Sequence, residues 1–294
     1  VRSAPKTATA VGWAVATKGA VPRQLGLSRA ALEANGFEGK AGQVLAVPTS
    51  DGLTVAIGIG DPGSIDVGGL RSAAAAFARA SSKHAHLATN LADVDGVDAK
   101  AAAQGVTEGV LLASYRYTGL KNEPSNASRL ESLALIAGDK RSKDVARGAD
   151  RGTIVSSAAA FARELANTPP TYLNAKDLAA KAVDIGSAAG LHVEVFNKDQ
   201  LEQMGCGGLL GVNRGSTEPP RMVKLTWSPK GSCSRRTATS GSRTTRASAP
   251  SWNRSRSWWG RNVTRASTRA PSVVRWSPPP LRSPASWRTR RRPT

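Results

Sequence analysis

The composition of the chain changes abruptly after Gly231. Residues 232–294 contain 15 Arg but no Lys, Asp or Glu, and five of the seven Trp lie among them. Neither the two-residue period of a strand nor the 3.6-residue period of a helix persists there. A segment of this composition does not easily build a core. We therefore expect residues 232–294 to be a disordered tail, and the folded part of the chain to end near Gly231.

The formal net charge of +20 arises mainly in this tail, because the first 231 residues carry 26 basic and 21 acidic side chains. Arg neutralises phosphates and Trp stacks on bases, so one hypothesis is a tail that binds nucleic acid. The absence of Lys, together with Trp258-Trp259 and Pro278-Pro279-Pro280, is unusual for such a tail. Arg, Ser, Pro, Ala and Trp together are typical of a GC-rich gene translated in another frame. We favour a frameshift near Gly231, which the DNA beyond that codon would test.

The first 150 residues alternate between strand and helix patterns, which predicts an α/β fold with a mixed sheet flanked by helices. Ser28 is a predicted N-cap for a short helix through Leu32. Asp51-Gly52 predicts a hairpin turn. The other predicted helices cover residues 67–81 and 99–115, the latter with a strand near its end. The predicted strands cover residues 11–17, 43–48, 53–59, 84–91 and 130–137.

A highly charged segment, residues 138–152, suggests a domain boundary. The helix predicted next, over residues 153–166, stops before Pro169-Pro170, as the sterics before proline require. A second α/β pattern follows, with helices at residues 175–188 and 198–204 and strands at 192–196, 209–212 and 222–227. The predicted domains are therefore residues 1–150, residues 151–231 and the tail, 232–294.

Gly58-Ile59-Gly60-Asp61-Pro62-Gly63 matches the GxGxxG pattern, in which backbone amides cradle a pyrophosphate. Pro62 removes one amide donor. No acid follows at the distance where a ribose would be bound, since Asp93 lies too far along the chain. We therefore favour a glycine turn at the end of a strand.

His84 and His86 are predicted to share one face of a strand and are a candidate metal-binding pair. No third ligand is evident, because His192 opens a separate strand, so structural or surface histidines are favoured. Cys206 and Cys233 lack zinc-site spacing, and no GxSxG motif marks a nucleophilic serine. No apolar run is long enough to span a bilayer, and no signal peptide is evident. A cytoplasmic protein is therefore expected, without a membrane partner.

The segment Phe161–Pro170, Phe-Ala-Arg-Glu-Leu-Ala-Asn-Thr-Pro-Pro, resembles the linker helix and domain junction of the M17 leucyl aminopeptidases. Further short matches follow in the family's order, at Asp177–Ala179, Gly190–Val195, Leu201–Gly205, Gly208–Val212 and Gly215–Met222. The first 150 residues are similar more loosely, through Gly58-Ile59-Gly60 and Leu70–Ala74. The resemblance thus covers roughly residues 1–231.

This resemblance implies a macro-domain-like N-terminal domain, a linker helix and an α/β catalytic domain that is incomplete here. It also implies a homo-hexamer acting on peptide substrates with two divalent metals, Mn or Zn. Two metals that share a water generate a nucleophile at neutral pH and polarise the scissile carbonyl. A lysine and an arginine assist in the family.

The resemblance places the family's metal ligands beyond the position of Gly231, in motifs that this sequence lacks. Residues 232–294 offer no carboxylate and no lysine, whereas hard divalent metals need several oxygen ligands. We therefore assign no catalytic, metal-binding or cofactor-binding residue, and we expect this chain to bind no metal and to be inactive. The alternative is a non-enzymatic macro-like module with a basic tail that binds nucleic acid.

Overall fold

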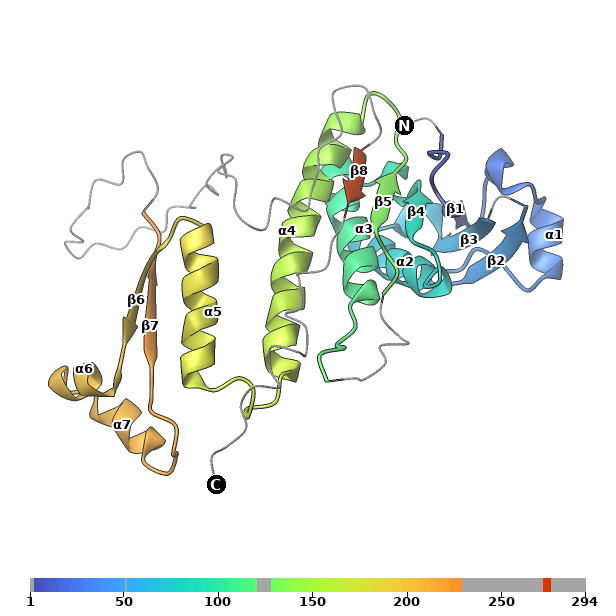
Figure 1. Cartoon of the computed structure of the whole chain (residues 1–294). Coiled ribbons are helices and arrows are strands. Elements are labelled where there is room, and N and C mark those ends of the chain that lie inside the picture. Colours follow the sequence, from blue (N-terminus) through green and yellow to red (C-terminus); the bar gives the residue numbers. More distant parts are fainter. Residues whose placement is uncertain (1–2, 51, 121–127, 229–271, 276–294) are drawn as a thin grey trace. The chain divides into compact units, whose positions relative to one another are not determined.

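The computed structural model describes residues 3–50, 52–120, 128–228 and 272–275. These residues form two compact units (Figure 1). The first unit comprises the described residues up to Asn167 together with Ser272–Arg275. The second comprises the described residues from Thr168 onward.

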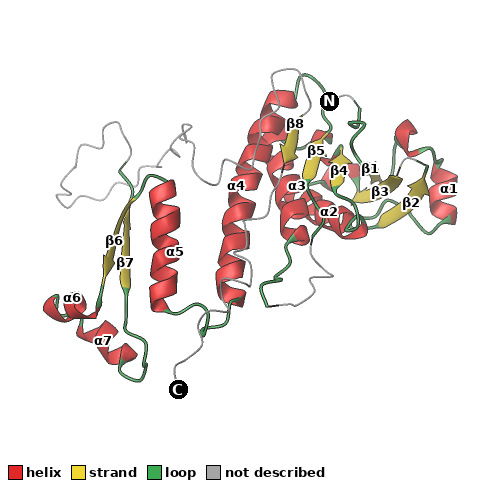
Figure 2. Ribbon diagram, viewed as in Figure 1, coloured by secondary structure: helices red, strands yellow, loops and turns green. Residues whose placement is uncertain are grey.

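The first unit is built on a six-stranded sheet of order β2-β3-β1-β4-β5-β8 (Figure 2). Four adjacent strands are parallel, and an antiparallel strand pairs at each edge. This confirms the predicted mixed sheet flanked by helices. The strands are β1 (Ala10–Ala16), β2 (Val44–Thr49), β3 (Gly52–Gly60), β4 (His86–Thr89), β5 (Ser132–Leu135) and β8 (Ser272–Arg275).

The helices of this unit follow the strands in the predicted alternation. The side chain of Ser28 accepts a hydrogen bond from the Ala31 amide, so the predicted N-cap is confirmed. The α-helices are α1 (Arg29–Ala34), α2 (Val67–Ala80), α3 (Ala99–Ser114) and α4 (Ser142–Asn167), and the 3-10 turns are η1 (Arg23–Leu25), η2 (Pro62–Ser64) and η3 (Leu91–Asp93). The strand predicted at the end of α3 does not form.

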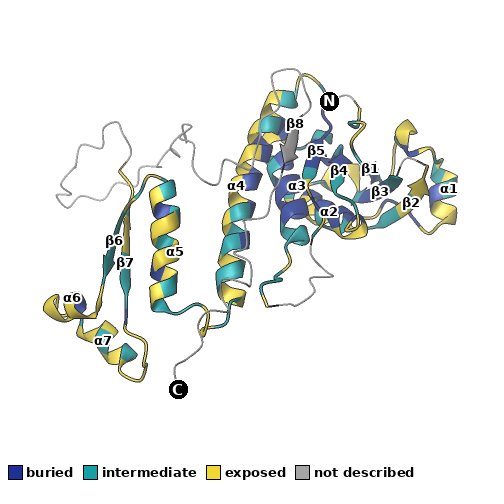
Figure 3. Cartoon of the chain, viewed as in Figure 1, coloured by how far each residue is buried: buried dark blue, intermediate teal, exposed yellow. Residues whose placement is uncertain are grey.

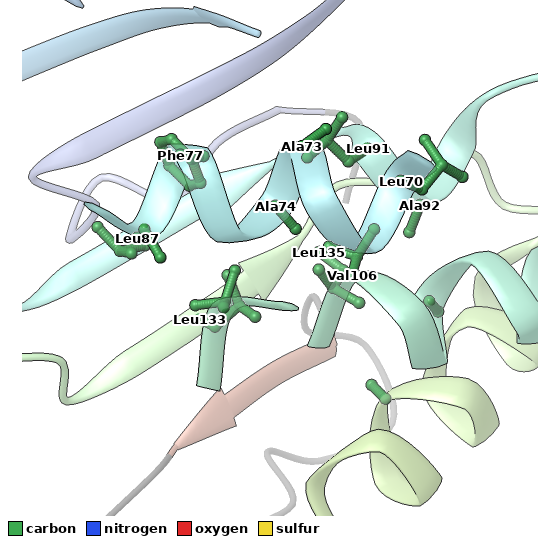
Figure 4. Packing of buried hydrophobic residues seen from close by; sticks show 14 of the residues in the cluster. Leu70, Ala73, Ala74, Phe77, Leu87, Leu91, Ala92, Val106, Leu133 and Leu135 are labelled. Carbon is green, nitrogen blue, oxygen red and sulfur yellow. The ribbon is translucent and has the colours of Figure 1, made fainter. Parts of the chain in front are cut away.

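The two faces of the sheet support two separate cores, because side chains alternate between faces along each strand. On one face, Leu133 and Leu135 of β5 join a large cluster with α2 and α3 (Figure 4). Phe77 of α2 belongs to this cluster and is fully buried. On the other face, Ala134 belongs to a smaller cluster with Trp13. Burial is thus continuous on both faces of the middle strands (Figure 3).

Helices α3 and α4 pack closely through glycines. A Cβ added to Gly148 would overlap the carbonyl oxygen of Lys100, and one added to Gly152 would lie 2.8 Å from the carbonyl oxygen of Gln104. The backbone of α4 therefore lies almost directly against that of α3.

Helix α4 corrects the predicted start of this element. The charged segment 138–152 lies mostly inside the helix, which runs without interruption to Asn167. Its buried stripe consists largely of small residues at helical spacing: Val145, Gly148, Ala149, Gly152, Thr153, Ser156 and Ala160. The sequence pattern did not predict this part of the helix, because glycine and alanine contribute little to an apolar period.

The second unit contains α5 (Ala175–Ala188), β6 (His192–Phe196), α6 (Lys198–Gln203), α7 (Gly207–Asn213) and β7 (Met222–Thr226). Strands β6 and β7 form an antiparallel pair. The strand predicted over residues 209–212 is wrong, because this segment is helix α7. A short apolar run next to glycines has no period that distinguishes a strand from a helix.

The tail is represented among the described residues by β8 alone. Its backbone pairs with β5, with Leu133 opposite Val274 and Ala134 opposite Val273. This strand differs from the expectation of a disordered tail, and the rest of residues 232–294 lies outside the described residues. No helix in the described part of the chain is long and apolar enough to cross a membrane.

Candidate functional site

The GxGxxG segment forms a tight turn at the end of β3. A Cβ on Gly58 would overlap the carbonyl oxygen of Lys40, and Gly60 has a φ of +82°. The N-terminus of α2 already carries a negative group, because the Asp66 carboxylate accepts from the Gly69 amide at 2.7 Å. A carboxylate in this place competes with a phosphate for the same amides. The geometry favours the glycine turn over a dinucleotide site.

The carboxyl ends of β1 and β4 are where an open α/β sheet normally places a ligand, because the strand order reverses there. In this chain, backbone and side-chain groups of the protein form hydrogen bonds with one another at that edge. The Asn90 side chain accepts from the Ala14 amide at 2.7 Å. Asp93 accepts from the Gly138 amide at 2.9 Å, and Arg141 donates to the Val94 carbonyl at 2.9 Å. These bonds connect the strand ends to the start of α4.

The three histidines are dispersed rather than gathered. His84 lies in the turn before β4, so the prediction that it shares a strand face with His86 is wrong. The Nδ1 atom of His86 lies 3.0 Å from the Ser132 hydroxyl. His192 is in the second unit, with its Nε2 atom 3.9 Å from Glu194. Within the described ranges, no three His, Cys, Asp or Glu side chains come together to hold a metal ion.

A small polar hollow lies beside the ends of α2 and α3. Its volume is about 40 Å³, and its lining includes Ser81, His84 and Arg116. Ligand pockets for small molecules usually enclose about 300–1,000 Å³. This hollow has room for only a few water molecules.

The motif at the end of α4 forms a polar cluster with the end of α3. The Tyr115 hydroxyl donates to Glu164 at 3.0 Å and accepts from the Asn167 amide at 3.3 Å. The Arg163 guanidinium lies 5.8 Å from the centre of the Tyr115 ring and donates to the Leu112 carbonyl at 3.2 Å. The Phe-Ala-Arg-Glu-Leu-Ala-Asn segment thus fixes the end of α4 on α3. The motif is recognisable in the sequence, but its contacts are not.

Burial raises the pKa of Tyr115 above its usual 10.0, and the adjacent Glu164 raises it further, while the Asn167 hydrogen bond opposes the shift. The neutral phenol is therefore favoured in the folded state. The contribution of Tyr115 to stability is fully present below pH 10 and is lost as pH rises through the raised pKa.

We expect a late-titrating tyrosine component in ultraviolet absorbance, which should be absent from the Tyr115→Phe variant. A Tyr115 component at or below the usual value would contradict this.

Comparison with known proteins gives a consistent pattern. The profile for "Cytosol aminopeptidase family, N-terminal domain" matches residues 16–124, and the profile for "Cytosol aminopeptidase family, catalytic domain" matches residues 160–243. A "Probable cytosol aminopeptidase" of Corynebacterium diphtheriae is 35% identical over 68% of this chain and 39% of its own length. One from Mycobacterium ulcerans is 37% identical over 67% and 37%, respectively.

Solved structures agree with these sequence matches. The bottromycin maturation enzyme BotP is 32% identical with a TM-score of 0.63, over 75% of this chain and 46% of BotP. A BotP structure in complex with Mn gives a TM-score of 0.64 at 31% identity. A tomato leucine aminopeptidase mutant has the same fold, with a TM-score of 0.65 at 24% identity over 74% of this chain and 47% of that protein. This chain spans about two fifths of the length of its curated relatives.

Proposed function

Because the chain belongs to the cytosol aminopeptidase (M17) family, we propose that it carries the N-terminal domain and the beginning of a catalytic domain for peptide hydrolysis, and that it does not itself hydrolyse peptides. One observation carries the second half of the proposal. Residues 232–294 contain no Asp, Glu or Lys. The family resemblance places both the metal ligands and the catalytic lysine beyond the position of Gly231. BotP, which has been solved with Mn, supports divalent metal use in the family.

The described acidic residues do not gather into a metal-binding group, and two of the less exposed ones, Glu108 and Glu194, already have basic or amide partners. Glu108 is buried and lies 2.9 Å from the Arg71 guanidinium, and its second oxygen accepts from Gln104 at 2.8 Å. Glu194 lies 2.8 Å from Lys224, whose hydrogen bond lowers the pKa of Glu194. Two hard cations would need several free oxygens converging on one point. No catalytic step is therefore assigned to these residues.

An assay of Leu-p-nitroanilide hydrolysis tests the proposal. With added Mn, we expect no hydrolysis that a chelator abolishes, because the paired cations that activate water lack carboxylate ligands. The Corynebacterium diphtheriae relative, prepared in the same way, serves as the positive control. Chelator-sensitive turnover by the 294-residue chain, or one bound Mn or Zn per chain in the purified protein, would contradict the proposal.

The nucleic-acid hypothesis rests on the composition of the tail alone. The described residues add no observation in its favour, so we propose no second function. The macro-like character of the first unit, the homo-hexamer, the frameshift and the cytoplasmic location stay predictions.

A further inference from the structure

Strand β5 is fixed in the first unit independently of its pairing with β8. Leu133 and Leu135 are buried in the core with α2 and α3, and Ala134 is buried in the core on the opposite face. Parallel pairing with β4 holds one side of the β5 backbone. The other side is therefore a preformed row of backbone donors and acceptors, with which an extended segment can pair.

Strand β8 shows which kind of segment fits this edge (Figure 1). It pairs antiparallel with β5 over four residues, from Ser132 opposite Arg275 to Leu135 opposite Ser272. Its sequence, Ser-Val-Val-Arg, has two β-branched residues and neither an acid nor a proline, which is typical of a strand. The ladder is made by backbone groups, and every copy of the chain carries the same segment.

The connection that leads to β8 is long. The first unit is discontinuous in sequence, because the chain passes through the second unit before Ser272–Arg275 returns to the first. Residues 227–271, 45 in number, separate β7 from β8, and such a length reaches at most about 160 Å. A compact unit of about 170 residues has a radius of gyration of only about 15 Å. The connection therefore does not restrict β8 to the β5 of its own chain.

Pairing within one chain and pairing between two chains form the same ladder, because the paired residues are identical. Within one chain, the pairing must close a connection that includes the second unit, which costs entropy. Between two chains, the cost is that of association. Reciprocal exchange leaves neither β5 edge open, and exchange of an identical element is a low-cost route to a closed dimer. Protein concentration therefore decides between the two forms.

We propose that the outer edge of β5 is an interaction surface for a second copy of this chain, which supplies its own Ser272–Arg275 as the neighbouring strand. Two copies exchange these strands reciprocally, and the exchanged dimer gains population as the protein concentration rises. The exchange requires neither a bound metal nor a peptide substrate. It is therefore independent of the proposed function.

Cross-linking between two differently tagged full-length chains tests the exchange. Both chains carry Cys206→Ser and Cys233→Ser, which remove the native thiols. One chain also carries Ser132→Cys and the other Arg275→Cys, because these positions lie opposite each other in the register. The chains are incubated together and treated with a short thiol-specific cross-linker. We expect a product with both tags, whose yield rises at least about tenfold over a hundredfold range of protein concentration, by mass action.

Two controls accompany this experiment. Adding Val273→Pro and Val274→Pro to the Arg275→Cys chain removes amide donors from the ladder and should lower the yield at least about tenfold. Arg23→Cys, at an exposed position of η1, replaces Ser132→Cys and reports random collisions.

A chain that carries both Ser132→Cys and Arg275→Cys reports pairing within one molecule. Cross-linking confined to that chain, together with a monomeric mass in light scattering at the highest concentration, would overturn the inference. An equal yield from the proline variant or from the Arg23→Cys control would overturn it as well.

Discussion

Replacing Phe77 by alanine is expected to lower the free energy of unfolding of the first unit by about 3–5 kcal/mol, the range for buried Phe→Ala changes. Phe77 is fully buried in α2. Its ring fills the space beside Gly12 of β1, where an added Cβ would lie 2.8 Å from the ring. Truncation would leave a cavity that the rigid sheet cannot close. For a unit of this size the melting temperature should fall by roughly 10 °C.

Denaturant unfolding followed by circular dichroism measures the effect of the Phe77 variant. Ile154→Ala is the control, because Ile154 is 62% exposed on α4 and its truncation should change stability by less than about 0.5 kcal/mol. A similar loss in both variants would contradict the close packing of Phe77 in this core.

The second large effect is expected from Gly148→Ala, which adds one methyl group between α3 and α4. The new Cβ would overlap the Lys100 carbonyl oxygen and lie 2.8 Å from the Ala103 Cβ. The Lys100 carbonyl oxygen belongs to the backbone, and the Ala103 Cβ is bonded directly to the backbone. Neither atom can therefore move away by a side-chain rotation. Overpacking of this kind costs typically about 1–3 kcal/mol, and we expect the upper part of that range.

Gly68→Ala provides the matched control for the Gly148 variant. Gly68 lies in α2, and its nearest contact for an added Cβ is 3.5 Å away, at the Asp66 carboxylate. There the substitution should be neutral or stabilising by up to about 1 kcal/mol, because alanine has the higher helix propensity. Equal destabilisation of both variants would contradict close packing of α3 on α4.

Most elements of the first unit could be predicted because the local sequence pattern and the tertiary environment favour the same secondary structure. The β-rich runs at residues 43–48 and 53–59 predicted the two strands of the β2–β3 hairpin. Of the predicted Asp51-Gly52 turn, Asp51 lies outside the described residues, and Gly52 already pairs with Thr49 as part of β3. The beginning of α4 and helix α7 could not be predicted in the same way. In α4 the contacts that select the helix come from α3, and in α7 seven residues are too few to establish a period.

The contacts at the candidate sites were harder to predict than the elements. Tyr115 lies some fifty positions before Glu164 and Asn167, so no local pattern could join them. His84 and His86 were expected to alternate onto one strand face, but β4 begins at His86. These contacts form only when segments that are distant in the sequence come together in the fold. A single sequence carries little information about which segments do so.

Strand β8 has a consequence for how the protein is made. Translation completes β1 to β5 and α4 long before the codons for Ser272–Arg275 reach the ribosome, and N-terminal units generally fold first. Bringing β8 to β5 across a chain segment that includes α4 and the described second unit carries a further entropic cost. Until β8 has been synthesised, β5 is an open edge strand of the newly made first unit. Other nascent chains on the same polysome can pair with β5 during this time.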